Sequence, residues 1–183
     1  FAALRSKHLI VEELRPREVG TNNAQRDFLL PTLSEAQQQA LQAIKRGHDD
    51  GRVALLHGIT GSGKTEIYIH LIAETLASGR DVVMLVPEIV ITSQLVERLE
   101  RIFEGRTTTY HSRLTALRRG ETFLRLSGSS GGELIVGVRS SIFLPTHNLG
   151  LIIVDEEHDA NYKQSDLAPR YNARDTAVYI AHA

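Results

Sequence analysis

Residues 57–66, HGITGSGKTE, decide the fold, because they match the phosphate-binding loop pattern G-x-x-x-x-G-K-[ST]. Gly58, Gly63, Lys64 and Thr65 occupy its fixed positions. Glycines allow the backbone to turn so that successive N–H groups converge on an anion, and the helix that follows adds the positive end of its dipole. In such a loop the lysine reaches the outer phosphates of a nucleotide and the hydroxyl holds Mg²⁺.

A loop of this kind requires a strand before it and a helix after it. Residues 52–57, RVALLH, have the apolar pattern of a buried strand, and residues 64–79 have a helical periodicity that ends at Gly79. We therefore predict a strand–loop–helix unit that binds a nucleotide. The alternative is a glycine-rich turn without a ligand, and the match of both the loop and its context argues against it.

From Pro31 onward the chain alternates strand patterns with helical patterns. A helix is predicted over 32–47, with Ser34 as its N-cap and Gly47 as its stop. Because the strands are mostly apolar along their length, we expect a doubly wound α/β domain, with a largely parallel sheet and helices on both faces. The other expected strands are 81–88, 107–111, 133–138 and 149–157, and the other helices are 92–103 and 114–126.

Acidic residues follow the last of these strands, in LGLIIVDEEHD (149–159). Open α/β sheets bind ligands at the carboxyl edge of their strands. Asp155 is therefore predicted to hold Mg²⁺, and Glu156 to orient and deprotonate an attacking water. The alternative is an ordinary acidic strand end. Glu157 is either a further functional acid or a solvated one, and His158 either couples the nucleotide to a second site or caps the loop.

The composition limits the class of protein. The chain has 183 residues, of which 42% are hydrophobic, and its net charge is −1. It has no cysteine, which excludes disulfides and a cysteine zinc site within this sequence and fits a reducing, cytoplasmic compartment. No apolar run reaches the length of a membrane span. The charge does not exclude a nucleic-acid motor, because backbone N–H and hydroxyl groups can also bind phosphates.

Several further segments carry a family resemblance. These are LSEAQ (33–37), VPEIVITSQ (86–94), VGVRSSIFLP (136–145), DEEH (155–158) and YKQSDLAPRYNARDTAVYIAH (162–182). The acid box resembles the DEAH-type boxes of superfamily 2 helicases. Together, the segments resemble the bacterial primosomal replication-restart DNA helicases of that superfamily, from about Leu33 to the end of the chain.

The resemblance implies an ATP-dependent 3′-to-5′ DNA helicase that assembles the primosome at stalled forks. It implies ATP and Mg²⁺ as cofactors, zinc only outside this sequence, and partners that include single-stranded and forked DNA, primosome proteins and single-stranded-DNA-binding protein. Residues 31–183 would be the first RecA-like lobe, 20–30 a linker and 1–19 the tail of an upstream domain, possibly a winged helix. Because the arginine finger of the family lies in a second lobe, we expect this chain alone to be nearly inactive.

The resemblance also implies residue roles. Gln37 would read the adenine, and the other ATP-binding residues would be Gly58, Thr60, Gly61, Ser62, Gly63, Lys64 and Thr65. The catalytic residues would be Lys64, Asp155 and Glu156. Thr65 and Asp155 would bind Mg²⁺. The residues for DNA binding and coupling would be Glu88, Arg139, Ser140, His158, Tyr162, Lys163, Arg170 and Tyr171.

Alternatives remain for some of these roles. Tyr162 and Tyr171 either stack on bases or belong to the core, and Arg139 either contacts DNA or is a structural ion-pair partner. Glu88 is acidic, so backbone N–H groups near it are the better candidates for phosphate contact.

Two other functions remain as alternatives to the restart helicase. One is another superfamily 2 translocase, and the other is a non-motor P-loop ATPase whose turnover would not respond to single-stranded DNA. Asn172, Val138 and Ser141 stand where other residues are commoner in the family, and Phe123 is the nearest aromatic to an expected tryptophan. These departures affect the expected DNA contacts and leave the ATP chemistry unchanged.

Overall fold

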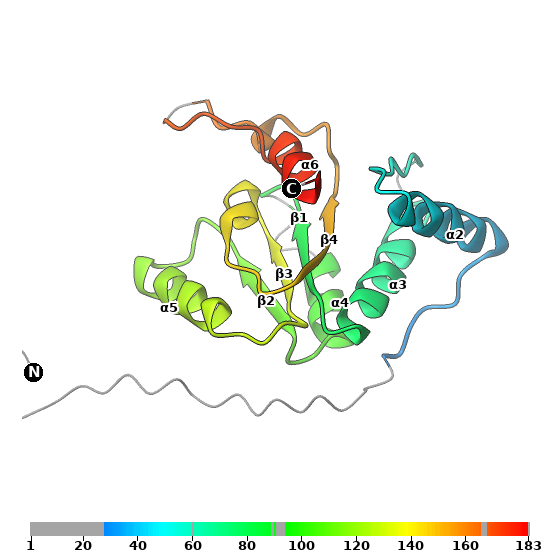
Figure 1. Ribbon diagram of the computed structural model, residues 1–183, viewed down its shortest axis with the longest axis horizontal. Helices are drawn as coiled ribbons and strands as arrows, with labels where there is room; N and C mark the ends of the chain where they lie inside the picture. Colours follow the sequence, from blue (N-terminus) through cyan, green and yellow to red (C-terminus); the bar gives the residue numbers. More distant parts are fainter. Residues whose placement is uncertain (1–27, 60, 89, 91–93, 166–167, 183) are drawn as a thin grey trace, which may run out of the picture.

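The computed structural model describes residues 28–59, 61–88, 90, 94–165 and 168–182. The expected upstream tail at 1–19 and most of the expected linker lie outside the described residues. The described part begins with α2 and ends with α6, and its helices surround one sheet (Figure 1). None of the helices in these residues is long and apolar enough to cross a membrane.

The sheet consists of parallel strands in the order β2-β3-β1-β4. Its central strand β1 is fully apolar after its first residue, as expected for a strand buried on both faces. Because side chains alternate along a strand, Val82 and Met84 enter the core on one face, whereas Val83 and Leu85 enter the core on the other. The strands are β1 (Asp81–Leu85), β2 (Thr107–Tyr110), β3 (Leu134–Gly137) and β4 (Leu149–Val154).

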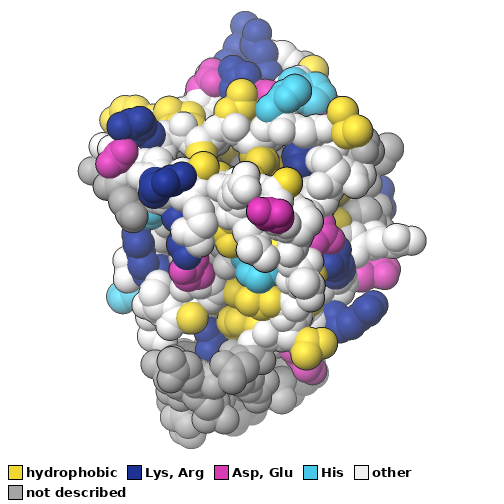
Figure 2. All heavy atoms as spheres, turned by 90° about the vertical axis from the view of Figure 1, so that its right-hand side faces the viewer, with side chains coloured by type: hydrophobic (Ala, Val, Ile, Leu, Met, Phe, Trp, Pro, Cys, Tyr) yellow, Lys and Arg dark blue, Asp and Glu magenta, His cyan; other side chains and the backbone are white. Residues whose placement is uncertain are grey.

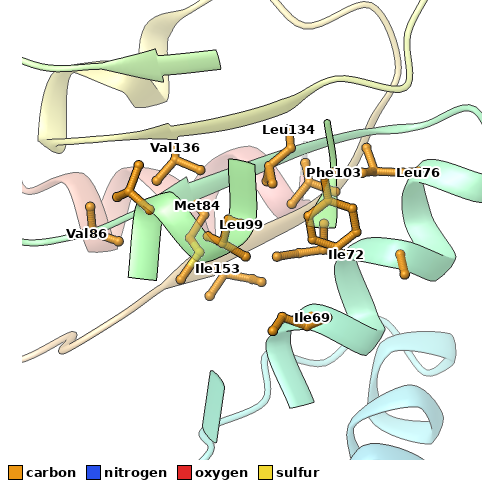
Figure 3. Close-up of a cluster of buried hydrophobic side chains, with 13 residues drawn as sticks. Ile69, Ile72, Leu76, Met84, Val86, Leu99, Phe103, Leu134, Val136 and Ile153 are labelled. Atoms are coloured by element: carbon orange, nitrogen blue, oxygen red, sulfur yellow. The ribbon is translucent and has the colours of Figure 1, made fainter. Parts of the chain in front are cut away.

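Helices cover both faces of this sheet. α3 (Lys64–Ala77) and α4 (Gln94–Ile102) pack on one face, where Ile72, Leu99 and Phe103 lie in a common core with side chains of the sheet (Figure 3). The other face packs against α5 (Ala116–Ser127), α6 (Ala173–His182) and a short 3₁₀ turn, η2 (Arg139–Phe143). The predicted α/β fold, with a parallel sheet covered on both faces, is confirmed.

α2 (Glu35–Asp49) lies outside this sandwich and packs on α3 through a small cluster of Leu33, Leu41 and Ile67. Its start agrees with the sequence, since Ser34 is the N-cap and forms a reciprocal capping box with Gln37. Its end does not agree: Gly47 is helical, and the first positive φ, 69°, comes at Gly51. A glycine inside a helix costs only about 1 kcal/mol, so it does not by itself end one.

The strand predicted over 52–57 is wrong. Residues 52–59 have no regular secondary structure, and β4 is the edge of the sheet within the described residues. Val53 and Leu55 are 60% and 75% exposed, while Leu56 packs against the α2–α3 cluster. An apolar run indicates that a segment can be buried, but it does not supply the pairing partner that makes it a strand.

The face that carries α2 is shown in Figure 2. Hydrophobic side chains lie at its surface among charged ones, and Lys or Arg side chains alternate with Asp or Glu side chains. This mixture agrees with a net charge of −1. Most of the residues predicted to bind the nucleotide lie instead at the carboxyl end of the strands and at the start of α3.

Candidate nucleotide-binding site

The phosphate-binding loop turns sharply into α3. Gly61 and Gly63 both have φ of 81°, a left-handed conformation that side chains resist, and Ser62 N donates to Ile59 O at 3.1 Å. Gly63 is the N-cap of α3 and provides no side-chain acceptor. The first-turn N–H groups of Lys64 and Thr65 make no hydrogen bond to a described residue. They are therefore free to bind an anion. Thr60, which was also expected here, lies outside the described residues.

Lys64 folds back over the loop. Its Nζ donates to the carbonyl oxygen of Gly58 at 2.7 Å, which places the ammonium group at the first glycine of the loop. The Ser62 side chain lies close to Gly58, since a Cβ on Gly58 would be 2.6 Å from Ser62 Oγ. The loop thus brings one positive charge and several N–H donors to the same small region.

Gln37, expected to read the adenine, contacts the loop itself. Its Nε2 donates to the carbonyl oxygen of Gly63 at 3.2 Å, while its Oε1 accepts from Ser34 N at 2.8 Å. A Cβ on Gly63 would lie only 2.1 Å from that Nε2. One side chain therefore both caps α2 and ties it to the start of α3. The adenine contact stays a prediction.

Asp155 is the first residue after β4, and its N–H donates to Leu85 O at 2.9 Å. Burial raises the pKa of its carboxyl group, and the charge of Glu156 adds to the rise, whereas a hydrogen bond from Tyr68 and the charge of Lys64 lower it. The hydrogen bond from Tyr68, at 3.3 Å from Asp155 Oδ1, places the acid beside the helix that begins at the loop. Asp155 thus lies at the carboxyl edge of the sheet, where α/β proteins bind ligands.

Glu156 has a φ of 47°, the one described non-glycine residue with a positive φ. Such a conformation is uncommon and persists where the surroundings enforce it. The turn points the carboxylate to the exterior, with Oε2 3.7 Å from His158 Nε2. The Glu157 carboxylate lies 3.8 Å from Arg174 Nη1 on α6 and is 41% exposed, which fits the solvated alternative.

Tyr162 does not present its ring to a ligand. Its side chain is 2% exposed and belongs to the core, and its hydroxyl donates to the carbonyl oxygen of Asp155 at 2.6 Å. The base-stacking role implied for it does not fit this burial. Tyr171 is partly exposed and packs edge-on against Phe143, with ring centroids 4.9 Å apart.

Arg139 supports the backbone on both sides of Tyr162. Its Nη1 donates to the carbonyl oxygens of Lys163 at 3.1 Å and Asn161 at 3.4 Å. These bonds flank Tyr162, and the segment closes beyond it where Lys163 bridges to Asn172. Among the described residues, Arg139 thus contacts carbonyl groups, and its DNA contact stays a prediction.

The remaining predicted DNA-side residues are surface residues. The carboxylate of Glu88, after β1, accepts a hydrogen bond from the Ser112 hydroxyl, after β2. The side chains of Ser140, Lys163 and Arg170 are exposed, as is that of His158. These side chains are open to solvent, and their DNA contacts stay predictions.

Sequence reasoning missed Tyr68, whose hydroxyl donates to Asp155 Oδ1 at 3.3 Å. The signal was in the spacing, because Tyr68 lies four residues after Lys64 and three after Thr65. Residues three and four apart share one face of a helix. A polar aromatic on the ligand-facing side of α3 was therefore visible in the sequence.

The donors at this edge fit a magnesium nucleotide. Mg²⁺ is usually held by one or two protein oxygens together with phosphates and water, and the hydroxyl of Thr65 and the carboxylate of Asp155 are such groups. The described residues include no cluster of three or more His, Cys, Asp or Glu side chains that would hold a metal unaided. The free N–H groups and Lys64 supply the complement to the phosphates.

A phosphate-binding loop and an acid box at the carboxyl edge of a parallel sheet are the features of a helicase-type nucleotide site. Residues 34–175 match the family model of the DEAD/DEAH box helicases. The chain belongs to the DEAD/DEAH box helicase family.

Its relatives are proteins named replication restart protein PriA. The chain is 42% identical to that of Rickettsia conorii (strain ATCC VR-613 / Malish 7) over 90% of its own length and 24% of the relative. It is 46% identical to that of Helicobacter pylori (strain ATCC 700392 / 26695), over 84% of its own length and 24% of the relative. The chain is 44% identical to that of Synechocystis sp. (strain ATCC 27184 / PCC 6803 / Kazusa), over 80% of its own length and 17% of the relative. The chain thus spans about a quarter or less of these relatives. The resemblance drawn from the motifs is confirmed.

Proposed function

We propose that the intact protein is an ATP-dependent DNA helicase of replication restart, and that this chain is its ATP-binding lobe. The observation that carries the proposal is the junction of α3 with the end of β4. There the Tyr68–Asp155 hydrogen bond joins the helix that carries Lys64 and Thr65 to the acid box. The match to the DEAD/DEAH box helicase model and the similarity to replication restart proteins support the proposal.

In this proposal the substrate is ATP with Mg²⁺, and hydrolysis of its terminal phosphoanhydride bond releases the energy. Lys64 exchanges its contact with the Gly58 carbonyl for one with the outer phosphates, and the N–H groups of the loop bind the rest. Thr65 and Asp155 hold the metal. Glu156 accepts a proton from the attacking water, and its exposed carboxylate is accessible to solvent for this purpose. The loop residues Gly58, Thr60, Gly61, Ser62 and Gly63, with Gln37 at the adenine, complete the site.

The DNA side of the proposal rests on the segment from Tyr162 to Tyr171 and the residues around it. Exposed Lys163 and Arg170 would meet phosphates, and the partly exposed ring of Tyr171 would stack on a base. Arg139 and Tyr162 would transmit the position of this segment to Asp155. Glu88, Ser140 and His158 are the further candidates for contact or coupling.

The proposed setting is the cytoplasm, at stalled forks. Single-stranded and forked DNA would be the substrates, and primosome proteins and single-stranded-DNA-binding protein the partners. Zinc would be bound only outside this sequence. We expect this chain alone to turn over ATP roughly 10³-fold or more slowly than the intact protein, because loss of an arginine finger has that effect in other NTPases.

A strand-separation assay tests the proposal. The intact protein is expected to separate a partial duplex with a 3′ single-stranded tail in the presence of ATP and Mg²⁺, and to leave a duplex with a 5′ tail intact. Lys64→Ala should abolish separation while DNA binding remains, because the lysine serves the nucleotide and not the DNA. Equal separation of both duplexes would contradict the direction, and separation by Lys64→Ala would contradict the assigned site.

A further inference from the structure

Asp155 accepts hydrogen bonds from two tyrosine side chains, one packed on each face of the sheet. Tyr68, which packs with the core on the α3 side, donates its hydroxyl to Oδ1 at 3.3 Å. Tyr162, which belongs to the core on the α6 side, donates its hydroxyl to the carbonyl oxygen of the same residue at 2.6 Å. The first bond restrains the carboxylate and the second restrains the backbone that carries it.

Both tyrosine hydroxyls act as donors to Asp155. A phenol has an ordinary pKa of about 10, so it carries its proton at neutral pH. A neutral phenol donates one hydrogen bond and can leave the other carboxylate oxygen free for a cation.

The backbone after Asp155 requires such support. Glu156, the second residue after β4, adopts its positive φ of 47° within the turn that follows the strand. The bonds from Asp155 N to Leu85 O and from Tyr162 to the Asp155 carbonyl fix the point where this turn begins. An uncommon backbone conformation persists only when neighbouring contacts over-determine it.

Tyr68 also lies on the correct side of α3. It is three residues beyond Thr65, so both side chains leave the helix on the same face. The hydrogen bond from Tyr68 therefore holds the Asp155 carboxylate against the face of α3 that also carries the Thr65 hydroxyl. Outer partners of this kind commonly change metal affinity by about 10- to 100-fold.

We propose that Tyr68 is a positioning residue of the magnesium site, holding the Asp155 carboxylate toward Thr65 while Tyr162 holds its backbone. The inference rests on the proposed function, since it concerns the same nucleotide site. It assigns to Tyr68 no contact with nucleotide or DNA. Removal of its hydroxyl should therefore weaken Mg²⁺ binding without affecting binding of the nucleotide alone.

The test is a Mg²⁺ titration of the intact protein and of Tyr68→Phe, followed by the binding of a fluorescent ATP analogue and by ATP turnover. We expect the Mg²⁺ concentration for half-maximal binding and turnover to rise about 10-fold. Affinity for the analogue without Mg²⁺, and turnover at saturating Mg²⁺, should stay close to wild type. Phenylalanine keeps the ring in the same space, and a thermal melt checks that the fold is intact.

Tyr179→Phe is the matched control, because Tyr179 is 75% exposed on α6 and its hydroxyl lies away from the site. In an Asp155→Asn background, Tyr68→Phe should add no further effect on Mg²⁺, since its action passes through the carboxylate. An unchanged Mg²⁺ midpoint in Tyr68→Phe, with Mg²⁺-dependent binding in the wild type, would overturn this inference alone. Absence of Mg²⁺-dependent nucleotide binding in the wild type would overturn the proposed function as well.

Discussion

Asp155 shows how a carboxylate placed for chemistry affects the stability of the fold. Its pKa is raised chiefly by burial, so the folded state binds this proton more tightly than the unfolded chain does. Below the ordinary pKa both states hold the proton and the group has no effect. As the pH rises through the window up to the raised pKa, the folded state must accept a buried charge, and stability falls.

The residue-scale prediction is that Asp155→Asn melts a few degrees higher than wild type near neutral pH. The amide removes the buried charge and keeps an acceptor for Tyr68. Thermal melts from acid to neutral pH should show the difference shrinking toward acid. Asp175→Asn, at a side chain that is 65% exposed, is the control with little change expected. A variant less stable than wild type near neutral pH would refute the linkage.

The sequence predicted the identity of the site residues better than their partners. Lys64, Thr65 and Asp155 could be found because spacing and a preceding apolar strand identify them. The bond from Tyr68 could not, because it joins α3 to the residue after β4 across many intervening residues. The bond from Tyr162 could not either, because it depends on how the turn after β4 folds back on Asp155. Asp81 is a similar case: it is 2% exposed and accepts from the N–H groups of Glu133 and His147, a role that no local pattern indicates.

At the scale of elements, the junction of α2 with α3 depends on Gly63. Its φ of 81° disfavours any side chain, and a Cβ would displace Gln37. Gly79, with a φ of 75°, is a matched control because a Cβ there would meet nothing within 4 Å. Both alanine variants should lose about 1–2 kcal/mol of stability from the backbone conformation alone.

Only Gly63→Ala should also weaken nucleotide binding. If the distorted loop loses one charge-assisted hydrogen bond to a phosphate, affinity should fall about 10- to 100-fold. A fluorescent ATP analogue measures the affinity, and thermal unfolding measures the stability. Equal losses of affinity in Gly63→Ala and Gly79→Ala would show that the contact with Gln37 has no part in binding.

The pattern of elements was predictable where a segment has both periodicity and a local end signal. α2 begins at its Ser34 cap as expected, and α3 follows the glycine loop. The prediction failed at 52–57, because an apolar run does not specify a neighbouring strand, and there Leu56 packs with α2 and α3 instead. The strand expected over 149–157 ends at Val154, because the acid box forms the turn that begins the site.

At the scale of the whole molecule, fold and family follow from features within this chain, whereas activity on DNA is a proposal about the intact protein. The parallel sheet and the helicase family match are properties of the lobe. The chain spans 24% of the length of the Rickettsia conorii relative, so strand separation, its direction and its partners are proposals about the intact protein. The domain boundaries assigned from the sequence likewise stay predictions.

The measurement that tests the account most directly is ATP turnover by the intact protein, with and without forked DNA that carries a single-stranded arm, at one fixed salt concentration. The account predicts strong stimulation by the DNA, since the segment from Tyr162 to Tyr171 is proposed to report DNA binding to Asp155. Turnover that does not change with DNA, in a protein that still binds ATP, would contradict it. Such a result would leave a nucleotide site that does not drive a DNA motor.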